Sequence, residues 1–293
     1  MDVADGGIVP LIAETGGINA MLVDSTALPE QVSDAVVQSA FRSAGQRCSA
    51  LRLRCVHAEI ADPVVAMIQG AAQELVTGDP ADLATDVGPV IDREAFDGIH
   101  KECERLQREA KPLLSAQPKP QRPVPVRAEL VEGPAKASTL GQAQDRPSST
   151  DTEIANLVPP QAFEVQSIAD LKQEIFGPVL HIVRWSGDPQ DVIAQINALG
   201  YGLTIGIQTR IDSRAQALAK AAHVGNVYIN RNQIGAVVGV QPFGGEGLSG
   251  TGPKAGGPHY LYRFCAEQTI TVNTTAAGGN AALLAGQAPV QAL

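Results

Sequence analysis

Residues 14–60 read ETGGINAMLVDSTALPEQVSDAVVQSAFRSAGQRCSALRLRCVHAEI, and this stretch decides the fold. AMLVD (20–24) is an apolar run typical of a β-strand. Over residues 29–43 an apolar residue returns every four positions, which predicts a helix that ends at Gly45. LRLRCVHAEI (51–60) predicts a second strand. A strand, a helix and another strand in this order predict an α/β fold with a mostly parallel sheet and flanking helices.

The same alternation continues toward the C-terminus. Asp62-Pro63 is expected to open a helix, and Asp92 to cap another that runs to about Ala110. Residues 111–162 are rich in Pro, Gln, Ser and Ala and are interpreted as an irregular surface excursion. The Gly/Ala-rich tail (276–293) is expected to be frayed. Further strands are predicted at 7–15, 178–185, 203–209, 225–230 and 269–274, and further helices at 188–199 and 213–223.

The composition limits the partners and the compartment. A net charge of −9 argues against a nucleic-acid partner, which calls for clustered Lys and Arg. It does not argue against a nucleotide cofactor, because backbone N–H groups can hold phosphates. No apolar run reaches the ~18 residues of a membrane span, and the N-terminus does not look like a signal peptide. The 4 cysteines lie far apart without a CxxC pair, so we expect free thiols, no metal site and a cytoplasmic protein.

Cys48 is the first candidate for chemistry. It stands in GQRCS, after a predicted helix and a glycine turn, with Arg47 before it and Ser49 after it. A nearby cation and backbone dipoles lower the pKa of a thiol and favour the nucleophilic thiolate. The alternative is that Cys48 is a small buried hydrophobic residue.

Two carboxylates and an aromatic ring are the next candidates. Glu14 lies between an apolar run and a Gly-Gly turn, where burial would raise its pKa and suit a general base. The alternative is a turn-capping acid. Glu174 and Phe176 in QEIFGPVL flank a turn that enters a strand. A carboxylate can accept both hydroxyls of a ribose and an aromatic ring can pack on a planar ring, although an edge acid and a core phenylalanine would give the same pattern.

The segment IGAVVGVQPFGGEGLSGTGPKAGGPHYL (234–261) is rich in glycine. Its backbone can therefore turn tightly and wrap a small ligand with its own N–H groups. It lacks the GxxxxGK[ST] spacing of a Walker loop. The alternative is a flexible surface loop, but Phe243 and the Pro-Phe-Gly-Gly turn argue for order.

Taken together and in this order, the four motifs resemble the aldehyde dehydrogenase superfamily. In that family a glutamate in an E-[LT]-G-G turn precedes the G-Q-x-C nucleophile by a fixed interval. Glu14 and Cys48 are 34 positions apart (48 − 14), which is the family interval, and the E-I-F-G-P motif follows. Over nearly its whole length the chain looks most like the glutamate γ-semialdehyde (pyrroline-5-carboxylate) dehydrogenases, including the C-terminal module of bifunctional proline utilization A proteins.

The resemblance implies catalytic roles. Cys48 would attack the aldehyde and form a thiohemiacetal, hydride transfer to NAD would leave a thioester, and Glu14 would activate the hydrolytic water. The backbone N–H of Cys48 would form one arm of the oxyanion hole. Glu174 would bind the nicotinamide ribose, with Phe176 packed beside it.

The resemblance also implies a site for the substrate, glutamate γ-semialdehyde. Arg47 and Ser49 would flank the nucleophile, Gly235 and Ala236 would hold the α-carboxylate and amine, and Phe243 would line the aliphatic part. The family more often has lysine where Arg47 stands, and serine is common where Ala236 stands. The first change keeps the cation, and the second loses a hydroxyl that backbone N–H groups could replace.

A domain plan follows from the same resemblance. Residues 1–16 would be a remnant of a Rossmann-like NAD-binding domain, 17–258 the catalytic domain with a return toward the cofactor domain from about residue 226, and 259–293 an oligomerisation strand with a flexible tail. The family's dinucleotide-binding fold precedes the E-[LT]-G-G turn, and only 13 residues do so here. We therefore expect a fragment that is weakly active or inactive alone, and that forms a homo-oligomer or pairs with a chain carrying the cofactor domain. Two rival hypotheses are a non-catalytic oligomerisation module and a cysteine esterase that needs no NAD.

Overall fold

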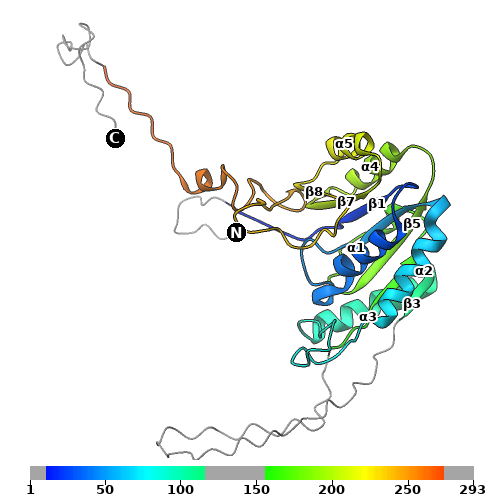
Figure 1. Cartoon of the computed structure of the whole chain (residues 1–293). Helices are drawn as coiled ribbons and strands as arrows, with labels where there is room; N and C mark the ends of the chain where they lie inside the picture. Colours follow the sequence, from blue (N-terminus) through cyan, green and yellow to red (C-terminus); the bar gives the residue numbers. More distant parts are fainter. Residues whose placement is uncertain (1–10, 116–155, 274–293) are drawn as a thin grey trace, which may run out of the picture. The chain divides into compact units, whose positions relative to one another are not determined.

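A computed structural model describes residues 11–115 and 156–273 of the chain (Figure 1). The chain divides after Tyr260 into two compact units. The first unit contains a 7-stranded sheet. Its strands are β1 (Ala20–Val23), β2 (Leu53–His57), β3 (Lys111–Ser115), β4 (Gln161–Glu164), β5 (Val179–Trp185), β7 (Thr204–Gln208) and β8 (Asn226–Ile229).

The strands lie in the order β3-β4-β5-β2-β1-β7-β8. Every neighbouring pair is parallel except β3 and β4, which are antiparallel. The mostly parallel α/β fold expected from the sequence is confirmed. A separate two-stranded antiparallel ribbon joins β6 (Tyr201–Gly202) to β9 (Glu246–Gly247).

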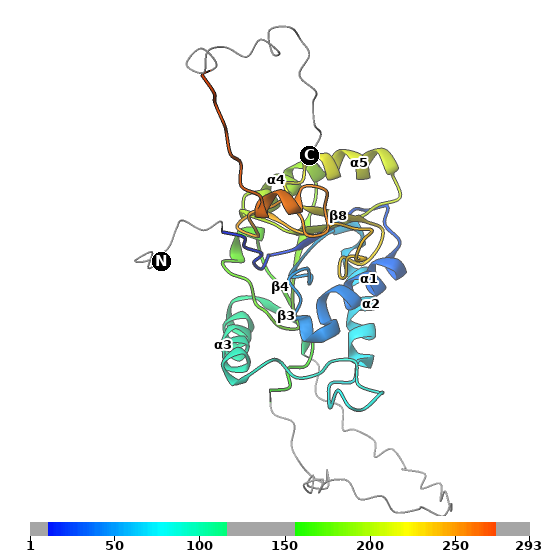
Figure 2. The same ribbon diagram turned by 90° about the vertical axis from the view of Figure 1, so that its left-hand side faces the viewer.

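Helices cover both faces of the sheet. Figure 2 shows α3 on one side of β3 and β4, and α1 and α2 on the other. On the α2 side, Arg184 of β5 pairs with Asp62 at 2.7 Å. The predicted apolar face of α1 is confirmed, because Val32, Val36 and Ala40 have no exposed surface. The helices are α1 (Pro29–Phe41), α2 (Ala58–Glu74), α3 (Arg93–Glu109), α4 (Pro189–Asn197) and α5 (Asp212–Ala221).

Capping residues in the sequence predicted the start of one helix correctly and the start of another wrongly. Asp92 caps α3 as predicted, since its side chain accepts the N–H of Ala95 at 2.8 Å. The predicted start of α2 at Asp62-Pro63 is wrong. The helix begins about one turn earlier, after His57, whose ring accepts the N–H of Glu59 at 3.4 Å, and Pro63 lies inside the helix.

Two strand predictions also need correction. The excursion predicted for residues 111–162 is wrong at its ends, because Lys111–Ser115 (β3) pairs with β4. Pro112 suits this place, since β3 is the edge strand and proline cannot donate to a ladder. Residues 11–15 of the predicted 7–15 strand form no strand, and Glu14 forms an isolated β-bridge with Gly250. Residues 7–10 and 116–155 lie outside the described residues, as does the tail from residue 274.

The second unit is described here only from residue 261 to residue 273. The short helix η3 (Tyr260–Phe264) runs into it, and residues 265–273 form no strand, so the strand predicted at 269–274 is wrong for the residues described. Ile270 and Val272 are 77 % and 69 % exposed. In the described part of the chain, no helix combines the length and apolar character that crossing a membrane would require.

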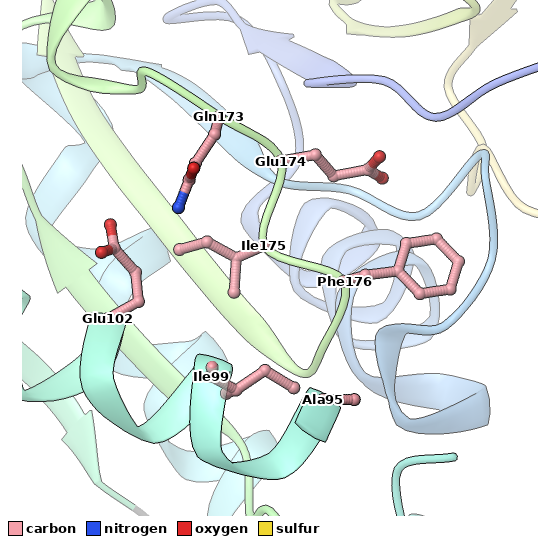
Figure 3. A pocket seen from close by; sticks show the side chains of 8 residues that line it. Ala95, Ile99, Glu102, Gln173, Glu174, Ile175 and Phe176 are labelled. Atoms are coloured by element: carbon pink, nitrogen blue, oxygen red, sulfur yellow. The ribbon is translucent and has the colours of Figure 1, made fainter. Parts of the chain in front are cut away.

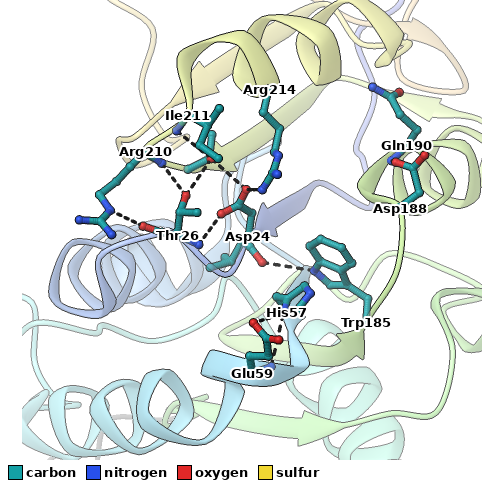
Figure 4. Close-up of polar contacts among 12 residues, drawn as sticks. Asp24, Thr26, His57, Glu59, Trp185, Asp188, Gln190, Arg210, Ile211 and Arg214 are labelled. Atoms are coloured by element: carbon teal, nitrogen blue, oxygen red, sulfur yellow. Dashed lines mark hydrogen bonds and ion pairs between the residues drawn. The ribbon is translucent and has the colours of Figure 1, made fainter.

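The carboxyl end of β1 is closed by a network of polar contacts (Figure 4). Asp24 is buried, accepts the N–H of Thr26 at 2.5 Å and the hydroxyl of Thr209 at 3.0 Å, and pairs with Arg214. Burial opposes ionisation, but these bonds together hold the pKa of Asp24 below its ordinary value. The network joins β1, β7 and α5.

Candidate active site

The candidate residues gather at the amino ends of the central parallel strands. Asn19 directly precedes β1, the turn that holds Cys48 precedes β2, and Gly177 lies two residues before β5. Ligands of open α/β sheets usually bind beyond the carboxyl ends of the strands. In this chain the Asp24 network occupies the carboxyl end of β1. The predicted catalytic residues lie at the other end, beside the amino ends of the strands.

The chain reaches Cys48 through an unusual turn. Ser43, Ala44 and Gly45 have φ values of 55°, 52° and 64°, so three consecutive residues are left-handed. Left-handed non-glycine residues cost of order 1 kcal/mol or more each and tend to cluster at functional sites. Gly45 is also required by space, because a Cβ there would lie 2.2 Å from the carbonyl oxygen of Gly177.

Cys48 itself is an exposed free thiol. It lies in a turn that the N–H of Ala50 closes by donating to the carbonyl oxygen of Arg47 at 3.0 Å. Burial raises the pKa of the Cys48 thiol, and the carboxylates of Glu174 and Glu14 raise it further.

Backbone N–H groups act in the opposite direction on this thiol. Those of Ser49 and of Cys48 itself lower its pKa, but the net direction is upward. The expectation that a neighbouring cation gives Cys48 a lowered pKa is therefore wrong for this structure. Arg47 turns instead toward Ser43, to whose hydroxyl its Nε donates at 3.0 Å.

Glu14 lies against the glycine-rich segment. It bridges to Gly250, and its Oε1 would be 3.0 Å from a Cβ at Gly244 and 3.2 Å from one at Gly250. Glycine at both positions therefore leaves room for this carboxylate. Glu14 is exposed, whereas the sequence pattern predicted a buried acid.

Glu174 is held by three donors. Its Oε1 accepts from Nε and Nη2 of Arg52 at 3.3 and 3.2 Å, and its Oε2 accepts the N–H of Gly17 at 3.1 Å. A Cβ at Gly16 would lie 1.6 Å from Oε2, so the carboxylate occupies the space that glycine leaves open. Burial raises the pKa of Glu174, although Arg52 and the N–H of Gly17 oppose the shift. The ETGG and EIFG motifs are thus in direct contact.

A cavity of about 210 Å³ lies between α3 and the segment Gln173–Phe176. Figure 3 shows Gln173 and Ile175 pointing toward α3, while Glu174 and Phe176 point the other way. The Phe176 ring is 43 % exposed, and the guanidinium carbon of Arg52 lies 5.2 Å from its centroid. The candidate cofactor residues therefore face away from α3, on the side of Arg52.

The predicted substrate residues are only partly brought together. Gly235 lies near Arg47, whose Nη1 would be 3.8 Å from a Cβ there. Ser49 is 4 % exposed and presents little surface to a ligand. Ala236 is half-buried. Phe243 is half-buried and paired with Ala255 through two backbone hydrogen bonds of 3.0 and 2.8 Å. Substrate contacts of these residues stay predictions.

Two buried polar residues in this site were missed by the sequence motifs. Arg52 is 1 % exposed and joins the Cys48 turn to Glu174, and Asn19 is 2 % exposed and bonds to the carbonyl oxygen of Cys48 at 2.6 Å. A signal was present in each case, because a polar residue stood inside or beside an apolar strand segment. Buried polar groups need partners, so each could have been expected to bond to a nearby loop.

Comparison with known proteins identifies the family. Residues 1–144 and 129–270 match the model of the Aldehyde dehydrogenase family. The chain belongs to the aldehyde dehydrogenase family.

Comparison with individual proteins shows which members of the family this chain is similar to. The chain is 48 % identical over 266 residues to the bifunctional protein PutA of Escherichia coli, a match that covers 90 % of this chain and 18 % of the relative. A crystal structure of a Bradyrhizobium japonicum proline utilization A variant is 50 % identical, with a TM-score of 0.76, over 94 % of this chain and 25 % of that one. A 1-pyrroline-5-carboxylate dehydrogenase from Thermus with bound NAD is 30 % identical, with a TM-score of 0.67, over 86 % of this chain and 43 % of that one. The chain thus spans less than half the length of each of these relatives.

Proposed function

We propose that this chain carries the nucleophile and the general base for NAD-dependent oxidation of L-glutamate γ-semialdehyde to L-glutamate, a step of proline catabolism. One observation supports it above all. Glu14, Cys48 and Glu174 come from separate motifs, yet both carboxylates are close enough to raise the pKa of the thiol. The names of the relatives supply the substrate class, since they include PutA and 1-pyrroline-5-carboxylate dehydrogenase.

The chain's own residues account for the acyl chemistry. With its raised pKa the Cys48 thiol is protonated at neutral pH, so its attack on the aldehyde carbon requires a base, and Glu14 takes that proton. The Cys48 N–H stabilises the negative charge on the carbonyl oxygen. NAD, when bound, would supply the hydride acceptor for that carbon, and the oxidised adduct on Cys48 would be a thioester. Once Glu14 has released the thiol proton to solvent, it takes a proton from water and the hydroxide oxygen adds to the thioester carbon. The carbon–sulfur bond then breaks, which releases the carboxylic acid and returns Cys48 as the thiolate.

Glu174 and Phe176 fit the ribose and the planar ring of such a cofactor. A carboxylate offers about four acceptor positions, and Glu174 uses three for Arg52 and Gly17. One position thus remains for a ribose hydroxyl. The exposed ring of Phe176 offers an apolar face. These two are the cofactor contacts assigned within the described residues, so we propose that the 293-residue chain alone binds NAD weakly.

The direct test mixes the chain with NAD and pyrroline-5-carboxylate and follows NADH absorbance. NADH formation that disappears in Cys48→Ala supports the proposal, and formation that persists in Cys48→Ala overturns it. An NAD titration by calorimetry tests cofactor affinity separately, and micromolar binding to the chain alone would contradict weak binding.

Ester hydrolysis without NAD is a second candidate function. The observation in its favour is that Cys48 and Glu14 are both exposed, so an activated ester can reach them without any cofactor. Turnover of a nitrophenyl ester that is lost in Cys48→Ala, in a chain that forms no NADH, would favour this function over the dehydrogenase. Silence in both assays would favour a non-catalytic module.

A further inference from the structure

The side chain of Asn19 is buried directly beneath the nucleophile turn. Its Nδ2 donates to the carbonyl oxygen of Cys48 at 2.6 Å and to that of Ala50 at 2.9 Å. Its Oδ1 accepts the N–H of Thr204 at 3.2 Å. Both ends of the amide are therefore in use, and they connect the turn to the start of β7.

The backbone of Asn19 holds the chain just beyond the turn. Its carbonyl oxygen accepts the N–H groups of Arg52 and Leu53 at 3.0 and 3.1 Å. Asn19 thus contacts the chain on both sides of residue 51. A second contact from the core to this turn, from the hydroxyl of Thr204 to the carbonyl oxygen of Ser49, is longer, at 3.5 Å.

Peptide geometry links this contact to the sulfur. The carbonyl group of Cys48 and the N–H of Ser49 belong to one planar trans peptide unit, so they point in opposite directions. When Asn19 draws the carbonyl inward, the Ser49 N–H must point outward. The Ser49 N–H is one of the two backbone donors that act on the Cys48 sulfur.

We propose that Asn19 is a positioning residue that orients the Cys48–Ser49 peptide and so aims the Ser49 N–H at the Cys48 sulfur. The inference rests on Cys48 being the nucleophile of the proposed function. Without the Nδ2 donor, this peptide is free to rotate, which removes a donor from the thiolate and can place a carbonyl oxygen beside it. The thiolate then loses a hydrogen bond and becomes harder to form.

The test measures how fast iodoacetamide alkylates Cys48 across a range of pH, with each cysteine followed by peptide mass spectrometry. Asn19→Asp is the sharpest variant, because it keeps an acceptor for Thr204 but replaces the donor that Cys48 needs. Asn19→Ala removes both contacts. In each we expect the Cys48 rate at neutral pH to fall roughly tenfold, the scale of losing one hydrogen bond to a charged group. Asn19→Ser, whose hydroxyl can still donate, should recover part of the rate.

Asn197→Ala is the matched control. Asn197 also uses both ends of its amide, donating to the carbonyl oxygen of Ala221 at 2.9 Å and accepting the N–H of His223 at 2.9 Å, but it joins the ends of α4 and α5. We expect it to lower the melting temperature and leave the Cys48 profile unchanged. If the Asn19 variants behave in the same way, Asn19 is only structural and the proposal is wrong.

The buried cysteines show whether each variant is folded. Cys55 and Cys103 are buried and react only when the fold opens, so their alkylation identifies a variant that has not folded. Should Asn19→Ala and Asn19→Asp unfold, Asn19→Ser decides, and a Cys48 profile equal to that of the unmodified chain overturns the proposal. The alkylation assay needs neither NAD nor aldehyde. A chain that forms no NADH even at a saturating NAD concentration, but shows the Asn19 effect, would therefore refute the dehydrogenase and keep the positioning role.

Discussion

The guanidinium group of buried Arg52 contacts the carboxylate of Glu174 at 3.2 Å, across 122 positions of sequence. The same group donates to the carbonyl oxygens of Gly177 at 3.0 Å and Arg47 at 3.3 Å, and it lies against the ring of Phe176. One side chain directly before β2 therefore holds the EIFG segment against the nucleophile turn.

Removing this guanidinium should be costly. Burial lowers the pKa of Arg52 and raises that of Glu174, so the pair is held in a place that disfavours both charges. Breaking a buried pair from one side leaves the other charge without compensation, and we expect Arg52→Met to reduce the free energy of unfolding by about 3–5 kcal/mol. Urea denaturation measures the change.

The matched control for this variant is Arg184→Met. Arg184 pairs with Asp62 and Glu164 but is 30 % exposed in its side chain, so its loss should cost only about 0–1 kcal/mol. The double variant Arg52→Met/Glu174→Gln should recover part of the stability. Equal losses in Arg52→Met and Arg184→Met would contradict the importance of the buried pair.

Charge near the nucleophile should be visible in its pH profile. Because the pKa of Cys48 is raised, its alkylation should keep increasing above the pH at which an ordinary thiol levels off. Glu174→Gln removes a negative charge and leaves the Arg52 cation nearby, so the profile should move to lower pH and the rate at neutral pH should rise. Glu164→Gln, remote from the thiol, should not move it. A shift to higher pH in Glu174→Gln would show that the carboxylate does not act on Cys48 through its charge.

Replacing Arg54, unlike replacing Arg52, should raise the free energy of unfolding. Arg54 has no exposed surface, and none of its guanidinium nitrogens has a hydrogen-bond partner among the residues that the structure describes. Burial lowers its pKa to about 9, which means that the charged form is disfavoured where it lies. Its neighbours across the sheet are Met21 and Ile182. We expect Arg54→Leu to raise the free energy of unfolding by about 1–4 kcal/mol, the range found when buried charges are replaced by apolar residues. A lower melting temperature would mean that Arg54 has a partner in solution.

The sequence predicted the elements that depend on local spacing and missed the contacts between residues far apart along the chain. The helix over residues 29–43 and the strand before it follow from apolar spacing, which burial requires at short range. The pairing of β3 with β4 joins segments on either side of residues 116–155, and no spacing within either segment indicates it. The same holds for the site. Cys48 and Glu14 were identified from motifs, but the roles of Asn19 and Arg52 depend on partners that the fold brings from far along the chain.

The effect of a methyl group at Gly16, beside Glu174, can be compared with its effect at a glycine that has open space around it. A methyl group at Gly16 would overlap Oε2 of Glu174, so Gly16→Ala must displace the carboxylate and break its bond to the N–H of Gly17. Overpacking of this kind costs about 1–3 kcal/mol. Gly70, inside α2, has nothing within 4 Å of its Cβ position, and Gly70→Ala should instead stabilise by about 0.5–1 kcal/mol because alanine favours the helix. Urea denaturation of both variants should therefore move in opposite directions. If Gly16→Ala is as stable as the unmodified chain, the Glu174 carboxylate can move away from Gly16 at little cost in free energy. A ribose would then bind a mobile carboxylate, and not one that Arg52 and Gly17 hold in place.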